Sequence, residues 1–145
     1  MIAYFDSSVL LAILLDEKTK AETYSWWSAS EVRVSSILLR IETITVIRRT
    51  WERYRARLES GWLTKKTKEY QEFIAEINLR IVDEEIENTI FLNSGFSRCR
   101  SLDAIHIATA LEWSRLMPQD DFILYTLDKD LGALAQSMKI KTNSP

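Results

Sequence analysis

The feature that most constrains the fold is an alternation, along the whole chain, between short apolar segments and longer amphipathic ones. Residues 2–5 form a short apolar run and residues 31–35 alternate, as strands do, whereas the segments after them repeat apolar side chains every three or four positions, as helices do. Strands that alternate with helices favour a parallel sheet with helices on both faces. We therefore expect an α/β fold, a three-layer α/β/α arrangement around a central parallel sheet of about five short strands. The predicted strands are residues 2–5, 31–35, 79–82, 122–127 and 140–142, and the predicted helices are residues 9–15, 19–30, 36–60, 64–78, 84–93, 101–116 and 129–138.

Four local signals set boundaries in this scheme. Ser36 and Asp83 are expected to cap the helices that follow them, and Ser101 is expected to cap the helix that carries Asp103. Gly61 is expected to end the long helix that begins at Ser36, because glycine commonly follows a helix C-terminus.

Composition indicates one globular domain spanning residues 1–145. The chain has 145 residues with 46% hydrophobic content, enough for one core, and only 3 Gly and 2 Pro. No apolar run is long enough to cross a membrane, and the first residues lack the basic start of a signal peptide. One cysteine, Cys99, excludes an internal disulfide and a multi-cysteine zinc site, and fits a cytoplasmic protein.

The charge is unevenly distributed. The net charge of −2 argues mildly against bulk affinity for nucleic acid. The middle third is nevertheless basic, with Arg48, Arg49, Arg53, Arg55, Arg57, Lys65, Lys66 and Lys68. A solvated helical face explains any one of these residues, and contact with phosphate groups is the alternative.

Four acidic residues occupy positions that suit a functional site. Asp6 and Asp128 each follow a predicted strand, at the sheet edge where open parallel sheets bind ligands, although helix capping explains either one alone. Glu42 lies on or beside the apolar face of its helix, where an unpaired charge is costly. It either binds a cation, or it reaches water at the edge of that face or pairs with Arg48 or Arg49. Asp103 falls in a first helical turn, which favours a negative charge, but its face of the helix also carries apolar residues.

Taken together, these carboxylates suit a magnesium or manganese site. Both ions prefer hard oxygen ligands, and no histidine is required. The only histidine, His106, follows Asp103 by three residues, and we expect it to be a packing residue.

Four segments of the chain resemble the motifs of PIN-domain ribonucleases, particularly the VapC-type toxins of toxin–antitoxin pairs. They are IAYFDSS at residues 2–8, SSILLRIE at residues 35–42, SLDAIHIATA at residues 101–110 and TLDKDL at residues 126–131. Their order and spacing suit the whole chain, whereas residues 50–95 match only in periodicity. Arg98-Cys99-Arg100 replaces the small residue that often precedes the third motif.

The resemblance implies a metal-dependent endoribonuclease that cleaves RNA through a four-carboxylate magnesium or manganese site. Asp6, Glu42, Asp103 and Asp128 would be both the metal ligands and the catalytic residues, with Ser8 and Thr126 as supporting hydroxyl groups. The resemblance also implies a homodimer that binds a small antitoxin protein. Asp128 is a candidate for orienting the attacking water.

Three other functions compete with this interpretation. A structure-specific DNA nuclease would use the same acids, so only substrate assays separate the two. A PIN-like module could bind RNA or protein without cutting, although all four acidic positions are filled here. A response-regulator-like domain expects paired acids after its first strand, and the sequence Asp6-Ser7-Ser8 does not supply them.

Overall fold

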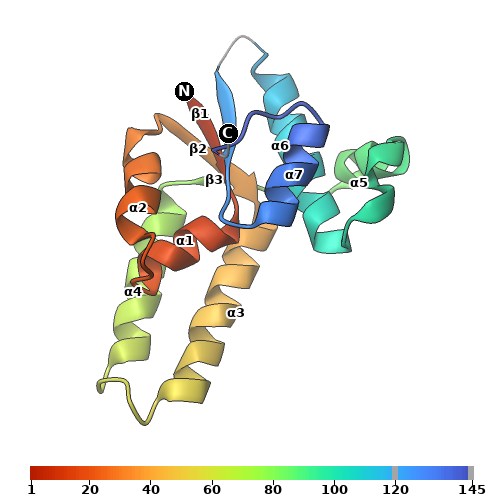
Figure 1. Ribbon diagram of the computed structural model, residues 1–145. Helices are drawn as coiled ribbons and strands as arrows, with labels where there is room; N and C mark the ends of the chain where they lie inside the picture. The colour runs from red at the N-terminus through yellow and green to blue at the C-terminus, as the bar shows by residue number, and fades with distance from the viewer. Residues whose placement is uncertain (119–120, 144–145) are drawn as a thin grey trace.

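The protein folds around a four-stranded parallel sheet (Figure 1). The structure is a computed structural model that describes residues 1–118 and 121–143. The strands lie in the order β3-β2-β1-β4. They are β1 (Ile2–Phe5), β2 (Val32–Ser36), β3 (Asn78–Arg80) and β4 (Phe122–Tyr125). The helices are α1 (Ser7–Leu14), α2 (Lys20–Ala29), α3 (Ile37–Tyr54), α4 (Trp62–Ala75), α5 (Glu84–Phe91), α6 (Ser101–Leu116) and α7 (Lys129–Ser137), with a 3₁₀ helix, η1 (Ser94–Arg98).

The sheet separates two hydrophobic cores. Successive side chains of a strand point to opposite faces, and in β1 all four residues are buried. Ile2 and Tyr4 pack into one core with α5, α6 and α7, whereas Ala3 and Phe5 pack into the other with α1, α2, α3 and α4. The predicted three-layer α/β/α architecture is therefore confirmed.

The strand order places a switch point beside β1. The chain runs from β1 to β2 and β3 on one side, and β4 then returns to the other side of β1. In the register of this pair Phe5 lies opposite Tyr125, so both strands end at one level. Ligands of open α/β sheets bind at such a point, outside the carboxyl ends of the strands.

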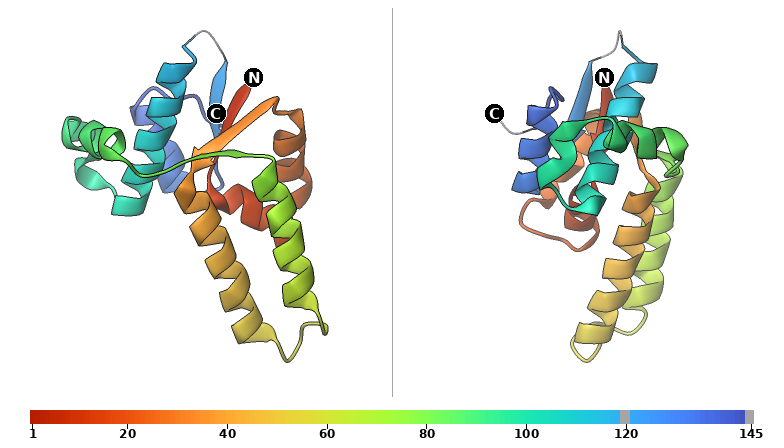
Figure 2. Two further views of the ribbon diagram at one scale, coloured as in Figure 1. Left: turned by 180° about the vertical axis from the view of Figure 1, so that it is seen from behind. Right: turned by 90° about the vertical axis from the view of Figure 1, so that its right-hand side faces the viewer.

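Helices α3 and α4 form a hairpin, which we call the α3–α4 arm, that projects away from the sheet (Figures 1 and 2). Trp51 and Trp62 stack between the two helices with ring centroids 6.3 Å apart. Lys66 anchors the arm to the turn after α1, because it is 7% exposed and pairs with both Asp16 and Glu69. Lys66 is thus a buried structural cation and not part of a solvated basic face.

Three expectations about the elements are wrong. The sheet has four described strands and not about five, since residues 140–142 contribute only a single bridge between Leu124 and Thr142. The long helix ends at Tyr54, and Gly61, with φ of 82°, instead precedes the first residue of α4. Arg100 and not Ser101 is the N-cap of α6. Ser36 and Asp83 do cap α3 and α5 through their side chains.

Within residues 1–118 and 121–143, no helix combines the length and the apolarity that crossing a membrane requires.

Candidate active site

A cavity of about 480 Å³, which we call the acid cavity, lies at the carboxyl ends of β1 and β4. Its lining includes all four predicted acids, namely Asp6, Glu42, Asp103 and Asp128, together with Ser8. These residues come from four separate segments of the chain: the ends of β1 and β4, the second turn of α3 and the first turn of α6. Thr126 is buried next to this group and contacts Asp6. The fold therefore brings together every site residue that the sequence predicted.

Asp6 is the most constrained of the four acids. It is 4% exposed, and its Oδ1 accepts hydrogen bonds from the Ser8 backbone amide at 2.8 Å and the Ser7 hydroxyl at 3.2 Å. Its Oδ2 accepts from the hydroxyl groups of Ser8, at 2.7 Å, and Thr126. Asp6 is thus the N-cap of α1, as the helix-capping alternative predicted, and also a carboxylate in the cavity wall. The two roles coexist.

The two predicted supporting hydroxyl groups join β1 to the loop after β4. The Ser8 hydroxyl accepts a hydrogen bond from the Leu127 amide at 2.9 Å, and the Thr126 hydroxyl accepts one from the Asp128 amide at 3.0 Å. Each hydroxyl therefore donates to Asp6 and accepts from the backbone that leads to Asp128. This arrangement fixes Asp6 and Asp128 relative to each other.

Asp128 is also a helix cap. Its Oδ1 accepts from the backbone amides of Asp130 at 2.9 Å and Leu131 at 3.1 Å, so it begins α7.

Glu42 is held by a residue that sequence reasoning set aside. Its Oε1 lies 2.7 Å from Nε2 of His106, and Nδ1 of His106 lies 2.8 Å from the Tyr4 hydroxyl. His106 is 3% exposed, so it is buried as a packing residue would be, but both its ring nitrogens are hydrogen-bonded. Its spacing of three residues from Asp103 on the same helix was the only signal in the sequence that pointed to this role.

The surroundings of Asp103 raise the pKa of its carboxyl group. Burial raises its pKa above the ordinary value of 3.8, the Arg100 guanidinium lowers it, and the negative charges of Asp128 and Asp6 raise it again. The Arg100 Nε atom lies 3.6 Å from Oδ2 of Asp103, but the Arg100 side chain is 79% exposed. Asp103 is therefore a carboxylate whose negative charge is only partly compensated, within electrostatic reach of two other acids of the cavity.

The donor set fits a divalent cation in its chemistry. Among the described residues, no three His, Cys, Asp or Glu side chains converge closely enough to hold an ion as they stand. Magnesium, however, usually keeps several waters and takes only one or two carboxylates from the protein. Four carboxylates around one cavity satisfy that requirement without converging on a single point.

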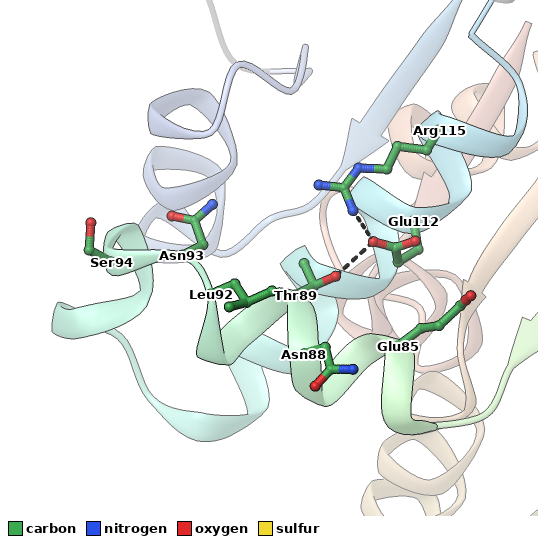
Figure 3. A pocket seen from close by; sticks show the side chains of 8 residues that line it. All are labelled: Glu85, Asn88, Thr89, Leu92, Asn93, Ser94, Glu112 and Arg115. Atoms are coloured by element: carbon green, nitrogen blue, oxygen red, sulfur yellow. Dashed lines mark hydrogen bonds and ion pairs between the residues drawn. The ribbon is translucent and has the colours of Figure 1, made fainter.

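A second cavity, of about 490 Å³, lies between α5, η1 and α6 and contains none of the predicted site residues (Figure 3). One of its carboxylates, Glu112, accepts a hydrogen bond from the Thr89 hydroxyl at 2.7 Å and pairs with Arg115. Those contacts link α5 to α6 and neutralise the charge. We assign this cavity a structural role.

Comparison with known families agrees with this geometry. The model of the PIN domain family matches residues 3–136, and the chain therefore belongs to that family. PIN domains are typically nucleases, and they generally use divalent metal ions. No curated protein matches the chain. Family membership removes the response-regulator-like alternative.

The raised pKa of Asp103 predicts whether replacing this residue stabilises or destabilises the protein. Since its pKa is raised in the folded state, ionising Asp103 costs stability as the pH rises through the window between 3.8 and that raised value. Asp103→Asn should therefore raise the melting temperature of the metal-free protein at neutral pH, by a few degrees at most.

That gain should vanish below the ordinary pKa of 3.8, where the carboxyl group is protonated in both the folded and the unfolded chain. Thermal melts followed by circular dichroism at several pH values check this. A loss of stability at neutral pH would mean that Asp103 is a structural acid.

Proposed function

We propose that the protein is a metal-dependent endoribonuclease, and that Asp6, Glu42, Asp103 and Asp128 are its metal-binding and catalytic residues. One observation carries the proposal: four acids from distant segments line one cavity at the switch point of a PIN-domain sheet. A divalent cation bound there would lower the pKa of a water molecule and neutralise charge on the scissile phosphate.

The protein's own residues have distinct parts in this proposal. Asp103 and Glu42 are the acids whose oxygens are least used by backbone amides, so they are the ones most available to a cation or a water. Asp6 and Asp128 are held by caps and by the hydroxyl groups of Ser8 and Thr126, which fixes their oxygens in the cavity wall. Their rigidity favours a precise geometry at the phosphate group.

The main competing function is binding without cleavage, and a DNA nuclease is the next. The complete set of acids favours cleavage over a binding module, because a site that only grips a polyanion has no use for four carboxylates facing it. The choice of RNA over DNA follows the resemblance to VapC-type toxins.

The central test is cleavage by matched acid variants. Asp103→Asn should lower the rate of cleavage of a structured RNA, such as transfer RNA, by at least about 100-fold, since losing even an outer-shell partner of a metal ligand costs about 10–100-fold. Asp130→Asn, which removes an exposed acid of the first turn of α7, should retain activity.

The assay runs with manganese, with a chelator, and with single- and double-stranded DNA in place of RNA. Full activity of Asp103→Asn would refute the site. Cleavage of DNA but not RNA would favour the competing nuclease, and binding of RNA without cleavage would favour the binding module.

We propose that the basic side of the α3–α4 arm binds RNA phosphates. Arg49 lines the acid cavity, and Arg53 lies one helical turn further along the same face of α3. Both are exposed, and the arm extends outward from the sheet (Figure 2). A polyanion bound along this face would lead directly to the four acids.

Removing one such contact should change the salt dependence of binding. In an Asp103→Asn background without metal, Arg53→Gln should weaken RNA binding and reduce the slope of log K against log salt by about one. The control is Lys139→Asn, which removes the same charge from an exposed residue beyond α7. Equal slopes for both variants and the parent protein would show that this part of the arm is only solvated.

We further propose a homodimer that binds a small antitoxin protein over the acid cavity. The resemblance to VapC-type toxins supports this, and so do the large apolar side chains exposed near α5, with Phe91 86% and Leu92 80% exposed. Light scattering of the purified protein should give twice the mass of one chain. A monomer at high concentration would contradict the homodimer.

A further inference from the structure

A chain of hydrogen bonds links β1, α6 and α3 and ends at the acid cavity. It runs from the Tyr4 hydroxyl on β1 to Nδ1 of His106 on α6, at 2.8 Å, and from Nε2 of His106 to Oε1 of Glu42 on α3, at 2.7 Å. Tyr4 is 0% and His106 3% exposed, whereas the Glu42 side chain is 30% exposed. The chain therefore passes from the interior to one oxygen in the cavity wall.

The hydrogen bonds around Tyr4 indicate which atoms of this chain donate and which accept. The Ser36 backbone amide donates to the Tyr4 oxygen at 3.2 Å, so the hydroxyl proton of Tyr4 is free to point at His106. With Nδ1 of His106 as the acceptor from Tyr4, Nε2 is the ring nitrogen that donates to Glu42.

We propose that Tyr4 and His106 are positioning residues, which select the histidine tautomer that holds Oε1 of Glu42 and leaves Oε2 facing the cavity. Within the described residues Oε2 of Glu42 makes no hydrogen bond, so it is the oxygen available to a cation. This inference rests on the proposed function, because Tyr4 and His106 act on the proposed metal site only through Glu42.

The burial of these groups supports a positioning role over simple packing. Apolar side chains of similar size would fill the same space without the cost of burying a hydroxyl and an imidazole. Glu42 has three rotatable side-chain bonds on an otherwise open face, and a bond to a fixed donor removes most of that freedom. Partners that orient metal-binding side chains typically contribute about 10–100-fold to metal affinity.

The test is calorimetric titration of manganese into metal-free protein, without RNA. Tyr4→Phe removes only the hydroxyl group, and we expect it to weaken manganese binding about 10-fold. His106→Leu removes the donor to Glu42 and should weaken binding at least as much. His106→Gln supplies an amide N–H of similar reach and should restore most of the affinity. The matched control, Tyr125→Phe, removes a tyrosine hydroxyl from β4 and should leave binding unchanged.

A double substitution separates positioning from general damage to the fold. If Tyr4 acts through Glu42, Tyr4→Phe should not weaken binding further in a Glu42→Gln background, since contacting residues in one network are not additive. Equal losses in both backgrounds would overturn the inference. So would wild-type affinity in both Tyr4→Phe and His106→Leu. Absence of manganese binding by the wild-type protein would instead overturn the proposed function, and the inference with it.

Discussion

The buried carboxylate of Asp6 is the point on which the site depends. An ionised carboxyl group in a nearly closed setting is tolerated only where hydrogen bonds replace its lost hydration. Here two hydroxyl donors of α1, one from the loop after β4 and one backbone amide supply them. The same bonds connect the end of β1, the start of α1 and the end of β4. Through these bonds, Asp6 also fixes the loop that carries Asp128.

Folding and function make opposing demands on these acids. As helix caps, Asp6 and Asp128 each stabilise the fold, typically by about 1 kcal/mol. In the same cavity their charges act against Asp103, whose pKa is raised by burial and further by Asp128 and Asp6. A protein without a divalent cation thus stores unfavourable electrostatic energy at this edge of the sheet. Binding of a cation would relieve it, and so would couple metal affinity to stability.

Much of this arrangement could be predicted from the sequence because its signals are local. The apolar run of β1, the capping side chains of Ser36 and Asp83, and the acid after β4 all lie next to the structure they determine. Parallel strands then bring the acids at their carboxyl ends together without further information. The four acids and the two hydroxyl groups of the site follow from these rules and from the motifs.

The remaining features depend on contacts between distant segments. His106 meets Tyr4 and Glu42, which lie 102 and 64 residues away along the chain, and its neighbours in sequence reveal neither bond. Lys66 is buried because Asp16, from the turn after α1, reaches it. Gly61 could end one helix or begin the next, since a glycine with positive φ suits either place, and only the early end of α3 decides between them.

The proposed function requires that the acid cavity bind a divalent cation. A crystal of the wild-type protein grown with manganese, with data collected where manganese scatters anomalously, tests it directly. We expect an anomalous peak in the cavity with oxygens of at least two of Asp6, Glu42, Asp103 and Asp128 about 2 Å away or bridged by one water. A crystal with manganese present and no peak in this cavity, or a peak only beside Glu112 in the second cavity, would contradict it.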